Sequence, residues 1–361
     1  MSTDGGPRPR PAVAAISPYV PGAAPPAVPG ALKLASNENP FGPSPLAVAA
    51  ARASLDDVNR YPEAGAPTLR AKLAERHGVA PAQVLVGSGS DEVLYLLAGV
   101  YLEPGRNAVM AAPPYAIHRI SAHYMGAEIT LVPLVDGVHD LPAMAAAARA
   151  AGGPGVLYLA NPHNPTGTIV PAADLETLVE TVPTDWLIVV DEAYHEFMRA
   201  GVRTTALDLL DRHPGLVVTR TFSKAYGLAG MRVGYAIAAA EVLEPVSRIR
   251  PPFNVSTPSL AAAAAALDDE AHLERTVRET LRARDSLVAA CERLGLRSLP
   301  SQANFLLVDD RGGWSAALAA EAISVRPGAN LGMPGWARIS LPRPEDLPRV
   351  VAILERHMAA R

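Results

Sequence analysis

Short apolar runs alternate with helical patterns along the first two thirds of the chain. The run at 187–190, Leu-Ile-Val-Val, contains no polar residue, and uninterrupted runs of this kind are typical of strands covered on both faces. Further strands are expected at 84–86, 107–111, 128–132, 156–159 and 216–219, most of them separated by helical segments. The alternation predicts an α/β fold whose mainly parallel sheet is covered by helices on each side.

Polar segments follow several of these strands. Ligands in open parallel sheets bind beyond the carboxyl ends of the strands. The segments expected at such ends are Gly-Ser-Gly-Ser at 87–90, Asn-Pro-Thr-Gly at 164–167, Asp-Glu-Ala-Tyr at 191–194 and Ser-Lys at 223–224. The sequence therefore predicts one site built from several distant parts of the chain.

The pattern changes after Ala240. A long amphipathic helix is expected at 270–294, strands at 305–308 and 337–341, and a last helix at about 345–358, which is typical of a smaller α+β unit. We therefore expect three parts: an N-terminal arm rich in Pro and Gly (residues 1–44), a large domain (45–245) and a small C-terminal domain (246–361).

Composition narrows the functional classes. The 361 residues are 49% hydrophobic and 19% charged, enough for a sizeable core. A formal charge of -4 without a basic block argues against nucleic acid as a partner. A single cysteine, Cys291, excludes an intrachain disulfide and a cysteine-based metal cage and fits a reducing compartment. No run approaches membrane-spanning length, and the polar N-terminus lacks a signal-peptide core. A cytoplasmic protein without a metal or membrane partner is expected.

A lysine stands directly after the strand at 216–219. Burial disfavours the charged form of a lysine, and a neutral amine condenses with an aldehyde. The hydroxyls of Thr221 and Ser223 and the guanidinium of Arg232 could surround a phosphate near Lys224. An aldehyde and a phosphate together suggest pyridoxal 5'-phosphate. The alternative is a surface lysine in a glycine-rich loop.

A second anion site is expected where Gly87-Ser88-Gly89-Ser90-Asp91 opens a helix. Free amides and the helix dipole favour a negative ligand at such a terminus. The segment lacks the third glycine and the acidic residue of a dinucleotide fingerprint, and it lacks the lysine of a P-loop. The alternative is an ordinary helix with Ser90 as its N-cap.

A series of motifs in order carries a family resemblance across nearly the whole chain. They are SPYVPG, LASNENPFGPSP, RYPEAG, GSGSDE, PPY, NPHNPTG, VVDEAY, TFSKAYGLAGMRVGY, VRPG and ARIS. The chain resembles the fold-type-I, aspartate-aminotransferase-like enzymes that depend on pyridoxal 5'-phosphate, and among them the histidinol-phosphate aminotransferase group. Two departures are His163, where the family often has Asn, and His118, where an aromatic residue is common.

The resemblance implies roles around the cofactor. Lys224 would hold the aldehyde at rest and later move the substrate's α-proton. Asp191 would hold the proton of the pyridine nitrogen, the alternative being a helix cap. Tyr194 and Asn164 would bond the phenolic oxygen, and Tyr115 would stack on the ring rather than only pack in the core. The phosphate would lie among Ser90, the Asp91 amide, Ser223 and Arg232. Tyr61 would reach it from a second subunit, which implies an obligate homodimer.

The resemblance also implies a substrate side. Arg338 would receive the distal anion or carboxylate, with Arg326 beside it, and two guanidiniums suit a phosphate. Each could instead form a surface ion pair. Tyr19 would cover the pocket from the arm, or else serve as a packing anchor. Asn39, in the Ser-Asn-Glu-Asn motif, is also assigned to the substrate.

Several functions fit these features. The first is transamination of L-histidinol phosphate with 2-oxoglutarate, giving imidazole acetol phosphate and L-glutamate. An aromatic amino-acid (Phe/Tyr) aminotransferase shares almost every feature. A lyase of the same fold, such as a phosphothreonine decarboxylase, would release carbon dioxide without needing 2-oxoglutarate. A non-catalytic regulator normally carries an N-terminal DNA-binding domain, for which an arm of about thirty residues leaves no room.

Overall fold

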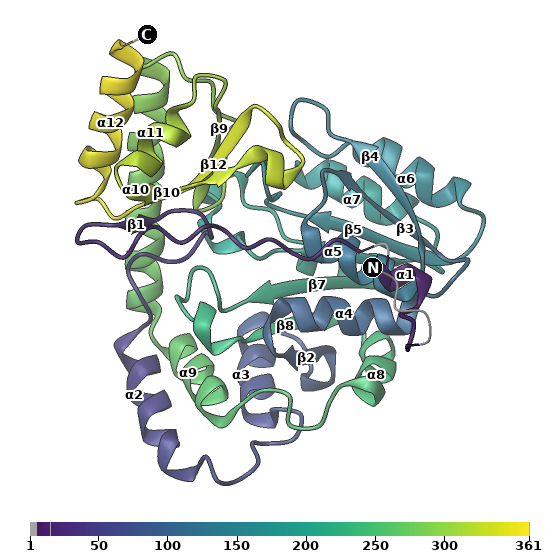
Figure 1. Cartoon of the computed structure of the whole chain (residues 1–361). Helices are drawn as coiled ribbons and strands as arrows, with labels where there is room; N and C mark the ends of the chain where they lie inside the picture. The colour runs from purple at the N-terminus through teal and green to yellow at the C-terminus, as the bar shows by residue number, and fades with distance from the viewer. Residues whose placement is uncertain (1–5, 15, 361) are drawn as a thin grey trace.

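The computed structural model describes residues 6–14 and 16–360. A seven-stranded sheet with the order β2-β8-β7-β6-β5-β3-β4 lies at its centre (Figure 1). Its strands are β2 (Val84–Gly87), β3 (Asn107–Ala112), β4 (Glu128–Pro133), β5 (Gly155–Ala160), β6 (Leu187–Asp191), β7 (Leu216–Thr221) and β8 (Gly234–Ala238). Only β8 runs antiparallel to its neighbours in this sheet. The mainly parallel α/β fold predicted from the sequence is confirmed.

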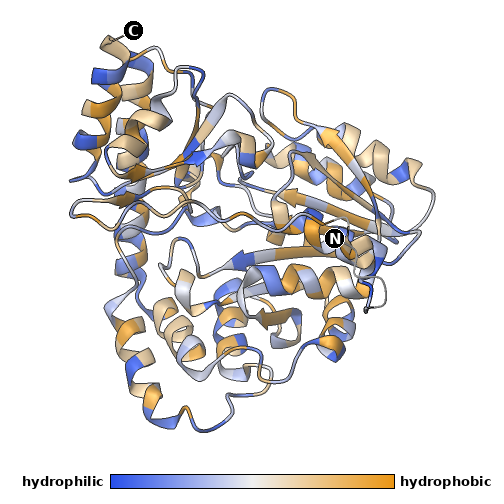
Figure 2. Ribbon diagram, in the orientation of Figure 1, coloured by the Kyte–Doolittle hydropathy of each residue, from blue (hydrophilic) through white to orange (hydrophobic). Residues whose placement is uncertain are grey.

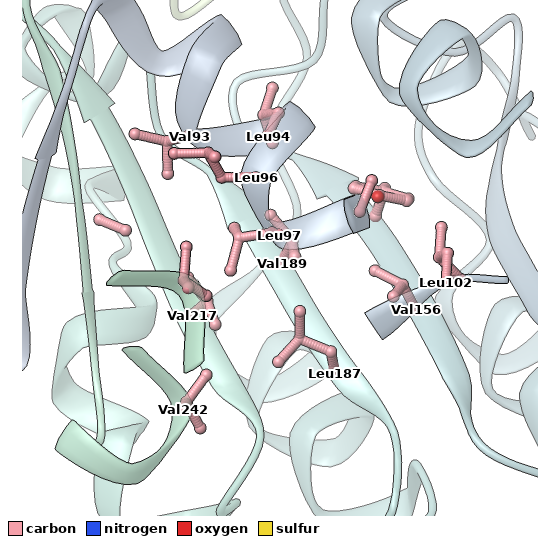
Figure 3. Close-up of a cluster of buried hydrophobic side chains, with 14 of the residues drawn as sticks. Val93, Leu94, Leu96, Leu97, Leu102, Val156, Leu187, Val189, Val217 and Val242 are labelled. Atoms are coloured by element: carbon pink, nitrogen blue, oxygen red, sulfur yellow. The ribbon is translucent and has the colours of Figure 1, made fainter. Parts of the chain in front are cut away.

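Helices cover both faces of this sheet. On one face, the buried side chains of α4 (Gly89–Tyr101) and α8 (Ala240–Ile249) share a core with Val189 and Val217 of the sheet (Figure 3). α5 (Ala116–Met125) adds Ala122 to this core. On the other face, α6 (Leu141–Ala150) and α7 (Ala172–Thr181) pack on Ile188 and Val190. Consecutive residues of β6 therefore enter opposite cores, which explains its uninterrupted apolar run.

The second unit is built around the long helix α10 (Glu270–Arg293). β11 (Arg326–Pro327), β12 (Trp336–Ser340) and β9 (Phe305–Asp309) form an antiparallel sheet in that order. α10 joins α11 (Trp314–Ala320) and α12 (Leu347–Ala359) around its core, where Leu287, Leu318 and Ile353 are buried. Both α10 and α12 carry hydrophilic and hydrophobic segments in Figure 2, as expected for helices with one covered face.

The core of the large unit also includes residues beyond 245. α9 (Thr257–Asp268) packs on α2 (Pro45–Ala53) and α3 (Pro67–His77), and Leu260 lies in the same core as Leu69. Leu273, near the start of α10, also packs against that core, while Leu287 farther along the helix lies in the core of the second unit. The apolar faces of α8 and α9 both belong to cores that cover the large sheet.

The arm connects the two units. β1 (Leu32–Lys33) pairs in parallel with β10 (Ile323–Ser324) of the second unit. At its other end, beside α1 (Pro11–Ala14), Arg10 donates a hydrogen bond of 2.9 Å to the carbonyl of Tyr124 on α5. The arm thus crosses the front of the molecule (Figure 1). Of the arm predicted at 1–44, residues 1–5 and 15 lie outside the described residues.

The remaining elements are short 3-10 helices. They are η1 (Ser54–Asp57), η2 (Pro81–Gln83), η3 (His195–Phe197), η4 (Ala200–Val202), η5 (Ala206–Arg212), η6 (Ala229–Met231) and η7 (Gly328–Leu331). Within residues 6–14 and 16–360, none of the helices has the length and apolar character needed to cross a membrane.

Candidate active site

A cavity of about 540 Å³ opens at the carboxyl ends of β5, β6 and β7. The large unit, the second unit and the arm all contribute to its wall. Most of the residues singled out from the sequence line it: Tyr19, Ser90, Asp91, Tyr115, Asn164, Asp191, Tyr194, Ser223, Lys224, Arg232, Arg326 and Arg338. Segments more than 300 residues apart in the sequence therefore meet at one place.

Lys224 follows β7 and reaches into this cavity. Its Nζ donates a hydrogen bond of 3.3 Å to the carbonyl of Ser36 and lies 5.7 Å from the ring centre of Tyr194. Burial and the nearby Arg338 guanidinium lower the pKa of Lys224 to about 8. A substantial fraction of this amine is therefore neutral near physiological pH, as a nucleophile or proton acceptor requires.

Asp191 ends β6 in the floor of the cavity. It is buried, and its Oδ1 accepts a hydrogen bond of 3.2 Å from the amide of Ala193. Its Oδ2 lies 3.4 Å from Nε2 of His118, which is itself buried and stacked on Tyr158. His118 was noted from the sequence only as a departure from the family, and contact with the carboxylate is what the structure adds. The Nε2 atom of His118 thus lies next to the Asp191 carboxylate.

Tyr194 presents its hydroxyl to the cavity between two amides. Asn37 donates to Tyr194 Oη at 3.0 Å and Asn164 donates at 3.3 Å. Since Oη accepts twice, its own proton is free to be donated to a ligand. Burial raises the pKa of Tyr194, so the hydroxyl keeps that proton at neutral pH.

The anion site predicted at the start of α4 lies beside the Ser223–Arg232 segment. The helix begins at Gly89 without a side-chain cap on Ser88, which leaves its first amides to bind a ligand. Arg232 donates to Ser223 Oγ at 3.5 Å and pairs with Asp91 Oδ2 at 3.3 Å. Gly89 has a φ of 83°, a conformation that favours glycine, and the Arg232 guanidinium lies 2.6 Å from where a Cβ would stand.

Tyr115 lies between the anion site and the floor. Its hydroxyl donates a hydrogen bond of 3.0 Å to Asp91 Oδ1, and its ring meets His118 edge to face with centres 5.3 Å apart. Burial and the Asp91 carboxylate raise the pKa of this hydroxyl. The ring lines the cavity as well as packing on the core, so both interpretations of Tyr115 describe part of its surroundings.

Two arginines form the wall from the second unit. Arg326 and Arg338 are register partners on β11 and β12, and both are buried. Arg338 donates to Asn164 Oδ1 at 2.5 Å and to the carbonyl of Ala35 at 3.1 Å. Among the described residues, the Nε atoms of both arginines are buried without a hydrogen-bond partner. Unsatisfied buried donors of positive charge favour an anionic ligand.

The arm crosses the mouth of the cavity. Residues 16–20 line it, and the Arg326 guanidinium lies 5.7 Å from the ring centre of Tyr19. Arg326 also donates to the carbonyl of Val20. Tyr19 is nevertheless 56% exposed, so it covers the cavity loosely rather than packing into a core.

Two predicted site residues lie elsewhere. Asn39 does not line the cavity: its Oδ1 accepts from the amide of Phe41 at 2.9 Å and its Nδ2 donates to the carbonyl of Ala225 at 3.0 Å. Asn37 takes the place in the cavity wall, in a left-handed conformation (φ 53°) that asparagine tolerates. The motif holds two asparagines, and nothing in its local pattern distinguishes the first from the second. Tyr61 is 81% exposed and lies outside the cavity.

Comparison with known proteins agrees with this geometry. Residues 29–354 match the family model for class I and II aminotransferases. The chain is 45% identical to histidinol-phosphate aminotransferase of Symbiobacterium thermophilum (96% of this chain, 97% of the relative). It is 44% identical to histidinol-phosphate aminotransferase 2 of Pseudomonas aeruginosa, with 97% of each covered.

Solved structures give the same result. The histidinol-phosphate aminotransferase of Sinorhizobium meliloti, in complex with pyridoxal-5'-phosphate, has a TM-score of 0.88 and 29% identity and covers 99% of this chain and 100% of its own. Aspartate aminotransferase of Thermus thermophilus shares the fold, with a TM-score of 0.82 and 22% identity over 97% of this chain and 99% of its own.

The cavity suits the cofactor bound by the Sinorhizobium enzyme. Hydroxyls, amides and Arg232 supply donors for a phosphate, Asp191 supplies a buried acid, and Lys224 supplies an amine of lowered pKa. The family predicted from the motifs is confirmed, together with its cofactor class. On the family match and the full-length relatives, the chain belongs to the class I and II aminotransferases, which depend on pyridoxal phosphate.

Proposed function

We propose that this protein transfers the amino group of L-histidinol phosphate to 2-oxoglutarate, giving imidazole acetol phosphate and L-glutamate. The observation that carries the proposal is the pair of buried arginines, Arg326 and Arg338, facing the same cavity as Lys224. Phosphate and carboxylate both bind guanidinium groups, and a phosphate monoester carries up to two charges. The relatives named above act on histidinol phosphate according to their names.

Lys224 is the proposed catalytic residue. When bound, pyridoxal phosphate supplies an electron sink that makes a proton on the substrate's α-carbon acidic. Lys224 Nζ would take that proton from the α-carbon and return it to the carbon two atoms away, across the nitrogen, which requires an amine that is partly neutral at working pH. Its pKa of about 8 supports this role.

Asp191 and Tyr194 would set the charge around the cofactor ring. A buried carboxylate at the end of β6 stabilises a positive charge placed against it. The Tyr194 hydroxyl, held by Asn37 and Asn164, would donate its remaining proton to an oxygen of the bound group. Ser90, Asp91 through its amide, Ser223 and Arg232 would hold the phosphate, with Tyr115 against the ring.

The substrate would lie between the two arginines and the arm. Arg338 is fixed by its hydrogen bonds to Asn164 and Ala35, so its unpaired Nε–H keeps one direction. Arg326 is held by the arm carbonyl of Val20, so substrate binding and arm position are linked. Tyr19 would cover the bound molecule.

A homodimer is part of the proposal, with Tyr61 completing the partner's phosphate site. Support comes from the surface around Tyr61, whose ring stacks on Phe253 at 4.5 Å and an interplanar angle of 17°. Leu46, Leu55 and Val58 are exposed on the neighbouring elements. Clustered exposed apolar side chains favour association with another protein surface.

We also place the protein in the cytoplasm. Cys291 is a free, buried thiol whose pKa burial raises to about 11. A lone unpaired cysteine fits a reducing compartment.

The test is amino-group exchange. The yellow holoenzyme is mixed with L-glutamate, and the cofactor spectrum is followed until it converts to the amine form and returns on addition of each oxo acid. Initial rates are then compared for histidinol phosphate, phenylalanine and tyrosine. A kcat/KM for phenylalanine equal to or above that for histidinol phosphate would assign an aromatic aminotransferase instead. Release of carbon dioxide without need for 2-oxoglutarate would assign a lyase.

A further inference from the structure

His163 occupies an unusual position for a buried histidine. It directly precedes Asn164, and both of its ring nitrogens are used. Nε2 lies 3.1 Å from the carbonyl oxygen of Pro113, and Nδ1 lies 2.9 Å from Thr166 Oγ1. Pro113 is two residues before Tyr115. The ring therefore joins the turn that carries Tyr115 to the turn that carries Asn164.

The two contacts determine the tautomer of the ring. A carbonyl oxygen only accepts, so Nε2 carries the hydrogen and donates it to Pro113. Nδ1 is then the acceptor nitrogen and lies 2.9 Å from the Thr166 hydroxyl, whose single proton is shared between Nδ1 and Thr168 Oγ1 at 2.7 Å. Burial lowers the pKa of His163 well below its usual range, which keeps the ring neutral with one donor and one acceptor.

The hydrogen bonds of His163 lie beyond the point where the ladder between β3 and β5 ends. The ladder between β3 and β5 ends with Met110 and Tyr158, although β3 continues to Ala112 and β5 to Ala160. The ladder between β5 and β6, by contrast, continues to Ala160 and Asp191. Beyond Met110 and Tyr158, the spacing of the two turns depends on side-chain contacts such as that of His163.

A second histidine supports the ring from behind. His139, in the loop after β4, lies with its Nε2 2.9 Å from the carbonyl of Ala160 at the end of β5. Its ring meets the His163 ring edge to face, with centres 4.5 Å apart. Thr168 fixes the same loop by donating to the carbonyl of Gly137 at 2.7 Å. The His163 ring has packing on one side and a hydrogen bond at each nitrogen, so its position is well defined.

We propose that His163 is a positioning residue: its link to Pro113 fixes the distance between the Tyr115 ring and the Asn164 amide across the cofactor. This inference rests on the proposed function for the identity of the cofactor. Losing the link would let the Tyr115 turn move away from the floor, which would weaken cofactor binding and slow the chemical step more than it changes substrate binding.

Three substitutions separate the two hydrogen bonds. His163→Gln places an amide nitrogen near the position of Nε2 and can keep the bond to Pro113. His163→Asn is shorter and can keep only the contact with Thr166. His163→Leu removes both. Cofactor-free protein is titrated with pyridoxal phosphate by fluorescence, and kcat and KM are measured on the reloaded enzyme.

A matched control exists at the amino-terminal end of the strands, opposite the end that carries the cavity. His213, which precedes β7, is also buried and lies with its Nε2 3.1 Å from the carbonyl of Pro183. His213→Leu removes the same kind of bond away from the cavity. It should lower the melting temperature while leaving the affinity for pyridoxal phosphate unchanged.

The Asn and Leu variants should bind pyridoxal phosphate about tenfold more weakly, with kcat lowered about fivefold and KM nearly constant, while Gln stays within about twofold of the wild type. The proposal is overturned if Gln is as impaired as Leu, or if Leu matches the wild type. If the Leu variant fails to fold, the comparison of Gln with Asn decides. Cofactor titration needs no amino donor. If the wild type binds the cofactor but exchanges no amino group, the proposed function is refuted while the role of His163 in cofactor binding can still be tested.

Discussion

The floor of the cavity and its rim are built differently. The floor, made of Asp191, Tyr194, Asn164 and Lys224, is fixed by hydrogen bonds within the chain. The rim includes Tyr19 from the arm and, in the proposed dimer, would include Tyr61 from a second copy; these two side chains are 56% and 81% exposed. Groups fixed before a ligand arrives act on the reaction itself, whereas exposed groups gain their position only from ligand or partner. Changes in the floor should therefore affect kcat, and changes at the rim should affect binding and assembly.

The largest effect is expected for Lys224→Ala, which removes the only proposed proton carrier of the floor. The variant should still bind pyridoxal phosphate, but turnover should fall by about 10² to 10⁴ or more. Borohydride reduction of the wild type followed by peptide mass spectrometry should label Lys224. Lys72→Ala, at an exposed ion pair with Asp268, is the control. Labelling of another lysine would refute the assignment.

Substitutions of the two wall arginines test which charged group of the substrate each one binds. Each charge-assisted hydrogen bond contributes about 1.5–3 kcal/mol, so Arg338→Ala and Arg326→Ala should each lower kcat/KM by roughly one to two powers of ten. Arg326, held by the arm, should affect histidinol phosphate more than phenylalanine.

The control is Arg356→Ala on α12, an exposed pair with Glu321. If Arg326→Ala lowers kcat/KM equally for histidinol phosphate and phenylalanine, the two arginines bind only a carboxylate and do not select the phosphate.

The rim is tested by mixing two impaired variants at a limiting concentration of pyridoxal phosphate. Tyr61→Phe should weaken cofactor retention about tenfold, because it removes one hydrogen bond to a charged phosphate. In hybrids with Lys224→Ala chains, one site carries both changes and the other neither, so part of the activity should return. Verified hybrids without any recovery would show that each site is built from one chain.

The smallest effect is a shift in pH dependence. In cofactor-free protein, attachment of pyridoxal phosphate needs neutral Lys224, so its rate should rise with pH and reach half of its maximum near the pKa of about 8. Arg338 is one of the groups that lower this pKa, so Arg338→Ala should move the midpoint upward. A midpoint unchanged in the variant would show that burial alone sets the pKa.

The sequence determined the elements and the cofactor side of the site. Strong local patterns predicted β6 at 186–190 and α10 at 270–294, close to the observed Leu187–Asp191 and Glu270–Arg293. β8 and α8 were not predicted. β8 is the antiparallel strand, which the alternation of parallel strands and helices does not reveal, and α8 contains Pro245, a residue that usually interrupts a helix.

Only the tertiary structure decided which neighbouring residues enter the cavity. Asn37 and Asn39 stand two apart in one motif, and the left-handed turn at Asn37 directs the first to Tyr194 and leaves the second against Ala225. His118 and His163 looked like departures from a family pattern, yet each contacts a site element from a distant strand. Composition and periodicity report what a segment prefers by itself. Contacts between segments far apart in the chain depend on how the sheet twists and where its ladders end, and that is decided only when the whole chain packs.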